Sequence, residues 1–134
     1  MTAAPPATVL YDADCGFCVW CMGKLLALDR RRALRPVALQ DRESDVLLAG
    51  MDAARRMASW HLVDRGGLVH SGGHALAPLV ALLPAGGPLA RVLARAPGLV
   101  DRCYRAIAGR RSASGRLVTA GARRRARARI ERRA

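Results

Sequence analysis

Aromatic residues and lysine are scarce in this chain. Phenylalanine, tyrosine and tryptophan together make up 4% of its 134 residues, and Lys24 is the single lysine among 23 basic residues. Arginine therefore carries the formal charge of +13 and gathers near the C-terminus, where 110–134 hold ten arginines and one glutamate. This stretch contains no aromatic residue and no recognised nucleic-acid-binding motif, so its charge predicts only nonspecific, salt-sensitive contacts with anionic molecules.

The chain also lacks an apolar run that could cross a membrane. Its longest uncharged stretch, 66–90, is broken by glycines and prolines, which a continuous span of about 20 apolar residues would not tolerate well. Residues 1–6 lack the basic start and the long apolar core of a signal peptide. We therefore expect a cytoplasmic protein without a membrane span.

A framework of spaced cysteine pairs is missing too. Three of the four cysteines, Cys15, Cys18 and Cys21, fall within seven residues. Small secreted proteins that are stapled by disulfides have a more widely spaced pattern, so we expect a reducing compartment. A chain of this length can bury about two thirds of its unfolded surface without such staples. We expect one folded domain over 1–109, followed by an arginine-rich tail over 110–134 that is flexible or partly helical.

What the chain does contain is a pair of thiols at C-x-x-C spacing. Cys15 and Cys18 stand where an apolar run, 9–11, gives way to a helical pattern over 17–29. A strand that leads into a helix places the first cysteine near unpaired backbone N–H groups, whose partial positive charge favours a thiolate. The second cysteine lies one helical turn further along and faces the same way. This placement predicts thiol-disulfide exchange, although the spacing alone also suits a metal.

Predicted strands and helices alternate around this pair. Strands are expected at 8–11, 34–39, 58–63 and 68–71, and helices at 17–29, 41–56, 75–83, 89–96 and 97–109. Pro36 cannot donate to a ladder on one side, so its strand belongs at a sheet edge, and the turn 64–67 joins the last two strands in a hairpin. The order β-α-β-α-β-β-α, with C-x-x-C after the first strand and additional C-terminal helices, predicts an α/β protein with a thioredoxin-like core.

The segment 11–18 closely resembles the signature of the DCC family of thiol-disulfide oxidoreductases. That family is named for an Asp-x-x-Cys-x-x-Cys motif, which Asp12, Cys15 and Cys18 match. Further features that look like those of the family lie at 59–64, 71–75 and Tyr104. The resemblance covers residues 8–111 and implies a thioredoxin-like fold and a redox activity.

We predict a role for each residue of the motif. Cys15 attacks a disulfide of the substrate, either a protein or a small molecule, and Cys18 then attacks the mixed disulfide and releases the reduced substrate. Asp12 accepts or returns the proton of Cys18, while Asp14 caps the helix; alternatively, both aspartates only form the turn and the cap. The dithiol needs no other cofactor, but an external thiol reductant must reset it.

One departure from the wider thioredoxin relatives concerns the approach to the third strand. Those relatives resemble one another in a cis-proline at this point, which faces the cysteines and presents backbone to the substrate. Here residues 55–59 contain no proline. This puts docking of a substrate through that backbone in doubt, and with it protein disulfides as the natural target.

The third clustered cysteine leaves a metal-binding module open as an alternative. A C-x-x-C-x-x-C run could hold an iron-sulfur cluster, although Leu25 stands where the fourth cysteine would fall. It could also contribute to a zinc site with His61, His70 or His74. We favour hydrogen-bonded or exposed histidines. The other alternative is a basic protein that binds nucleic acid or an anionic surface through 110–134.

Core packing is our expectation for the two cysteines outside the C-x-x-C pair. Free cysteines behave as small hydrophobic residues, and this favours burial of Cys21 and Cys103. Residues spaced three to four apart share one face of a helix. The apolar face predicted for the helix 97–109 contains Leu99, Val100, Cys103 and Ile107.

Overall fold

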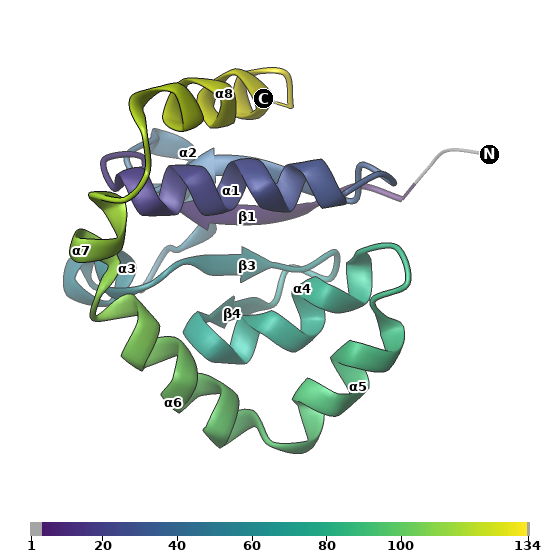
Figure 1. The fold of residues 1–134 in the computed structure, drawn as a ribbon. Helices are drawn as coiled ribbons and strands as arrows, with labels where there is room; N and C mark the ends of the chain where they lie inside the picture. The colour runs from purple at the N-terminus through teal and green to yellow at the C-terminus, as the bar shows by residue number, and fades with distance from the viewer. Residues whose placement is uncertain (1–3, 134) are drawn as a thin grey trace.

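The computed structural model describes residues 4–133 and contains a four-stranded mixed sheet with helices on both faces (Figure 1). The strands are β1 (Ala7–Tyr11), β2 (Leu34–Ala38), β3 (His61–Val63) and β4 (Val69–Ser71), in the order β2-β1-β3-β4. β1 is parallel to β2 and antiparallel to β3, and β3 is antiparallel to β4. The predicted α/β class and the predicted hairpin are confirmed.

Every residue of β1 is buried, as expected of a central strand. Successive side chains of a strand point to opposite faces. Val9 and Tyr11 therefore pack with α1 (Gly16–Leu28) and α4 (Leu76–Leu82), whereas Leu10 packs with Leu48 beside α2 (Arg42–Leu47). Pro36 of β2 pairs with Val9 of β1, and β2 lies at the sheet edge, as predicted.

The helical region predicted at 41–56 consists of two short helices. Gly50, whose φ of +88° lies in the left-handed region, provides the stop that was expected there. The remaining helices are α3 (Ala53–Ala58), the 3₁₀ helix η1 (Gly72–Ala75), α5 (Gly87–Arg95), α6 (Pro97–Ala108), α7 (Arg111–Gly115) and α8 (Ala120–Glu131). Within residues 4–133, no helix is long and apolar enough to span a bilayer.

The C-terminal segment is mostly helical, and its α8 lies along α1 (Figure 1). Ala126 and Ile130 are buried in the same core cluster as Val9. The two helices approach closely because Gly23 has no side chain: a Cβ at this position would lie 2.6 Å from the Cβ of Ala126. The division of the chain at residue 109 stays a prediction, but α8 contributes to the core of the fold.

Charge on α8 is divided between structural and exposed arginines. Arg129 donates to the carbonyl of Gly23 at 3.3 Å, and Arg133, just beyond the helix, reaches the end of α1. Arg124, Arg125 and Arg127 remain exposed. Nonspecific contacts of these exposed side chains with anionic molecules stay a prediction.

Candidate active site

The two thiols of the C-x-x-C pair lie at the start of α1, immediately after β1 ends. Cys15 is the N-cap residue, with extended backbone angles, and its sulfur accepts a hydrogen bond from the N–H of Cys18 at 3.4 Å. The prediction that Asp14 caps this helix is wrong, since the Cys15 sulfur occupies that role. Asp14 instead accepts a hydrogen bond from Gln40 Nε2 at 3.3 Å.

Cys15 and Cys18 are both free and half-buried. Burial is the main cause that raises the pKa of Cys18 to about 12, followed by the hydrogen bond between its thiol and Cys15 and by the charge of Cys15. Arg111 acts in the opposite direction, and Asp12 adds to the rise. Cys18 is therefore a thiol at neutral pH, able to donate its proton to the sulfur of Cys15.

Asp12 follows β1 directly and is held in place by a neighbouring loop. Its Oδ1 accepts hydrogen bonds from the N–H of Asp14 at 3.0 Å and from Nε2 of Gln40 at 2.8 Å. The sequence pattern alone did not point to Gln40. A signal was present, because it follows the strand parallel to β1, and the carboxyl ends of adjacent parallel strands lie side by side.

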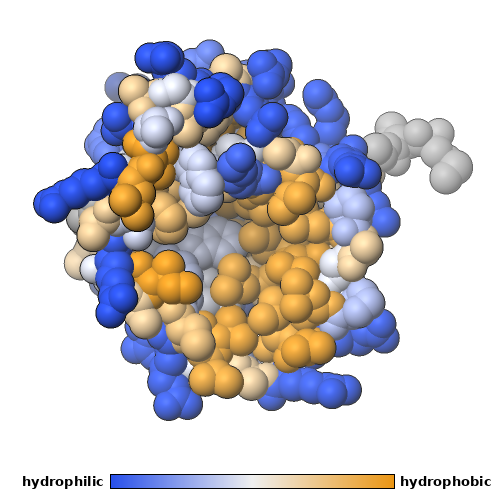
Figure 2. Space-filling view, in the orientation of Figure 1, coloured by the Kyte–Doolittle hydropathy of each residue, from blue (hydrophilic) through white to orange (hydrophobic). Residues whose placement is uncertain are grey.

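A cavity of about 610 Å³ opens beside Cys18, between α1 and the helices α4, α5 and α6. Figure 2 shows this face hollowed near its centre, with hydrophobic residues mainly to the right of the hollow and below it, and hydrophilic residues above it and toward the periphery. The face predicted for α6 is confirmed, because all four of its residues line the cavity: Leu99, Val100, Cys103 and Ile107. These side chains therefore border a cavity that adjoins the thiols.

The predicted core packing of Cys21 and Cys103 is wrong. Both residues are exposed, and both line the cavity together with Cys18. Although Cys21 is exposed as a residue, the cavity walls around its sulfur raise the pKa of this thiol to about 11, with a smaller contribution from the charge of Cys15. Three of the four thiols thus border one cavity.

The cavity wall contains few polar side chains, and Tyr104 and Arg111 are two of them. Tyr104 accepts a long hydrogen bond from the N–H of Trp60 at 3.4 Å, and burial raises its pKa. Arg111 donates to the carbonyl of Met57 at 3.3 Å. Arg111 lines the same cavity as Cys18 and Tyr104, and its positive charge acts to lower the pKa of both groups, against the larger effect of burial.

The three histidines have protein partners, as predicted. Nδ1 of His61 lies 2.7 Å from Oγ of Ser71, and Nε2 of His70 lies 2.9 Å from Oδ2 of Asp64. Nε2 of His74 lies 3.8 Å from Oδ2 of Asp101. Among residues 4–133, no group of three or more His, Cys, Asp or Glu side chains is arranged to hold a metal ion.

A parallel β-α-β unit, an antiparallel hairpin and a C-x-x-C pair at the start of the first helix together define a thioredoxin-like protein with added C-terminal helices. The family described as DCC1-like thiol-disulfide oxidoreductase matches residues 9–117. The chain belongs to this family, and the resemblance seen in its sequence is confirmed. Comparisons with curated proteins and with solved structures gave no match.

Proposed function

We propose that the protein reduces disulfides, with Cys15 as the attacking thiolate and Cys18 as the resolving thiol. Membership of an oxidoreductase family supports the exchange chemistry. The division of roles is supported by the position of Cys15 at the N-cap of α1, where its sulfur accepts the N–H of Cys18 at 3.4 Å, and by the burial that keeps Cys18 a thiol. An N–H donor binds a thiolate more strongly than a thiol. The hydrogen bond that the Cys15 sulfur accepts at the start of α1 is the observation that carries the proposal.

The reaction transfers two electrons to the substrate. The Cys15 thiolate attacks one substrate sulfur, the substrate S–S bond breaks, and the other substrate sulfur leaves as a thiolate. Cys18 then loses its proton and attacks the sulfur of Cys15. This step forms the Cys15–Cys18 disulfide and releases the second substrate sulfur. An external dithiol reduces the enzyme again by the same exchange.

Asp12 receives the proton of Cys18 in this scheme. A thiol with a pKa near 12 needs a base before it can attack at neutral pH. Asp12 lines the same cavity as Cys18, and its charge acts on that thiol. The two hydrogen bonds from Asp14 and Gln40 both end on Oδ1, and we assign the proton to Oδ2.

The need for an external reductant indicates the compartment in which the protein acts. A dithiol pool that regenerates Cys15 and Cys18 is typical of the cytoplasm, which we propose as the site of action. The substrate is a disulfide on a protein or on a small molecule.

Replacing the attacking thiol tests the proposal. We expect Cys15→Ser to abolish the dithiothreitol-dependent reduction of disulfides, because the attacking sulfur is lost. Asp14→Ser is the matched control, since Asp14 is the exposed residue next to Cys15 and lies outside the cavity wall, and it should retain turnover. Equal activity of wild-type protein and Cys15→Ser would overturn the assignment.

A further inference from the structure

The cavity beside Cys18 has the size and the lining of a small-molecule pocket. Its volume of about 610 Å³ lies within the range of roughly 300–1,000 Å³ that is usual for such pockets. Carbon atoms form most of its wall, to which α4, α5 and α6 contribute Leu76, Leu79, Leu93 and Leu99. A ligand that fills this space must present apolar surface, because buried polar groups would find few hydrogen-bond partners there.

One end of the cavity differs from the rest. Cys18, Asp12 and Arg111 all line it. Asp12 and Cys18 lie at the junction of β1 with α1, and α7, which begins at Arg111, packs against the start of α1 beside Phe17, so the charged side chains and the thiol share this end. Asp12 already accepts two hydrogen bonds. No carboxylate among the described residues pairs with Arg111, whose one hydrogen-bond acceptor there is the carbonyl of Met57. This guanidinium can therefore bind an anionic group of a ligand.

We propose that the cavity is the substrate pocket of the Cys15–Cys18 pair and selects a small disulfide that carries an apolar chain and one anionic group. The chain lies against the leucines of α4 to α6, and the anionic group binds Arg111. The inference rests on the proposed function and follows its electron balance: two electrons pass from the two thiols to the substrate, and an external dithiol restores them.

Three probe disulfides separate the features of such a ligand. Lipoate has a cyclic disulfide, an apolar chain and a carboxylate; lipoamide replaces the carboxylate with a neutral amide; and 2-hydroxyethyl disulfide has neither chain nor charge. With dithiothreitol as reductant, we expect kcat/KM to be highest for lipoate and about tenfold lower for lipoamide, because the charge-assisted contact is lost. Similar kcat/KM values for all three probes would overturn the inference.

Two alanines of α6 provide a matched pair of variants. Ala108 lines the cavity, whereas Ala106 is exposed outside it. Ala108→Trp fills the space and should lower kcat/KM for lipoate at least about tenfold more than for 2-hydroxyethyl disulfide. Ala106→Trp should change neither. A second pair of variants controls for misfolding. Leu99 lies in the cavity wall and Leu89 outside it, at similar exposures of 56% and 54%. Leu99→Gln should therefore lower kcat/KM for lipoate, and Leu89→Gln should not.

Arginine variants test the anionic end. Arg111→Gln should remove the preference for lipoate over lipoamide, whereas the adjacent, exposed Arg110→Gln should preserve it. The ratio of the two substrates is the readout, because Arg111 also affects the pKa of Cys18 and its loss slows both reactions. A ratio that Arg111→Gln leaves unchanged would contradict the contact.

Binding without chemistry separates the pocket from the proposed function. Octanoate has the chain and the carboxylate but no disulfide, and Trp60 in the cavity wall should report its binding by fluorescence. Octanoate that binds wild-type protein and Ala106→Trp but not Ala108→Trp would support the pocket, even if no probe were reduced and the proposed function failed. Turnover without binding or chain preference would overturn the pocket alone. If variants of the cavity wall slowed the reduction of insulin but not that of lipoate, the cavity would bind side chains of a protein substrate. This result would overturn the inference.

Discussion

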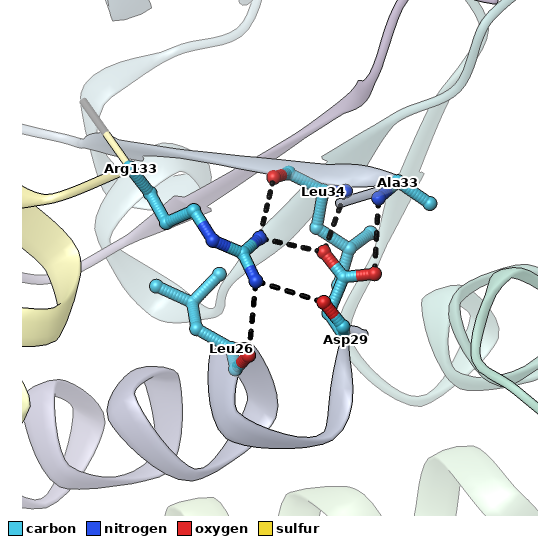
Figure 3. Close-up of polar contacts among 5 residues, drawn as sticks. All are labelled: Leu26, Asp29, Ala33, Leu34 and Arg133. Carbon is cyan, nitrogen blue, oxygen red and sulfur yellow. Dashed lines mark hydrogen bonds and ion pairs between the residues drawn. The ribbon is translucent and has the colours of Figure 1, made fainter. Parts of the chain in front are cut away.

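Arg133 donates from Nη1 to Asp29 Oδ2 at 2.8 Å, although 104 residues separate the two in sequence (Figure 3). Asp29 follows α1 and is fully buried. Its carboxylate also accepts the N–H groups of Ala33 and Leu34, which fix the start of β2. Nη2 of Arg133 donates to the carbonyls of Leu26 and Asp29. The end of the chain thus stabilises the connection between the first helix and the edge strand.

Replacement of Arg133 tests this connection. Arg133→Met leaves a buried carboxylate without its cation, and we expect a loss of about 2–4 kcal/mol in the free energy of unfolding. Arg132→Met, at an exposed neighbouring position, should change stability by less than about 0.5 kcal/mol. Urea denaturation measures both. Equal effects of the two variants would mean that the ion pair does not stabilise the fold.

Glycine at position 23 controls how closely α8 approaches α1. A Cβ there would lie 2.6 Å from the Cβ of Ala126 and 2.8 Å from its Cα, so Gly23→Ala must separate the helices. We expect a loss of about 1–3 kcal/mol. Gly98→Ala, in α6, is the control because no atom would lie within 4 Å of the new Cβ, and the better helix propensity of alanine should keep or slightly raise stability. Thermal unfolding of both variants tests the contact.

The sequence predicts the sheet and its first helix but not the docking of the C-terminal segment. Residues 9–11 of β1 form a continuous apolar run, Pro36 marks an edge strand, and the turn 64–67 marks the hairpin, so these features can be predicted from short stretches of sequence. α8 carries no comparable apolar stripe, since arginine and alanine dominate it and only Ala126 and Ile130 are buried. Its packing depends on the absence of a side chain at Gly23, whose significance emerges only when the partner helix is known.

Part of the candidate site can likewise be predicted from local sequence, and part depends on tertiary packing. The positions of Cys15 and Cys18 follow from local spacing, and so does the apolar face of α6. Cavity formation is a tertiary property, because α4, α5 and α6 bring distant leucines opposite α1. Cys103 shows the limit of sequence reasoning, since an apolar neighbourhood along a helix predicts burial whether that face meets a core or a cavity.

Asp12 offers a test in which proton transfer and simple electrostatics have opposite signs. Its charge raises the pKa of Cys18, so Asp12→Asn should lower that pKa and increase the alkylation rate of Cys18 at a given pH. If Asp12 accepts the proton of Cys18, turnover should nevertheless fall by about tenfold or more. Asp14→Asn, at the other carboxylate that Gln40 contacts, should retain turnover. Faster turnover of Asp12→Asn would contradict the role in proton transfer.

His61 predicts a loss of stability in acid. Burial lowers its pKa below the usual 6.5, and the bond to the Arg56 carbonyl requires a proton on Nε2, so that Nδ1 accepts from Ser71. As the pH falls below 6.5, the unfolded chain binds a proton that the folded chain excludes. Stability should therefore decrease from pH 7 toward about pH 5. This decrease should weaken in His61→Gln but persist in His74→Gln, and an unchanged pH slope in His61→Gln would contradict the assignment.

The central claim is that Cys15 attacks and Cys18 resolves, and trapping the intermediate tests it most directly. Reduced Cys18→Ser protein is mixed with an excess of a disulfide substrate, quenched with acid, and mapped by peptide mass spectrometry. We expect one substrate adduct on Cys15 of this variant, whereas the wild-type protein should form the internal Cys15–Cys18 disulfide and carry no adduct. An adduct on Cys21 or Cys103 in place of Cys15, or wild-type protein that forms no internal disulfide, would contradict the claim.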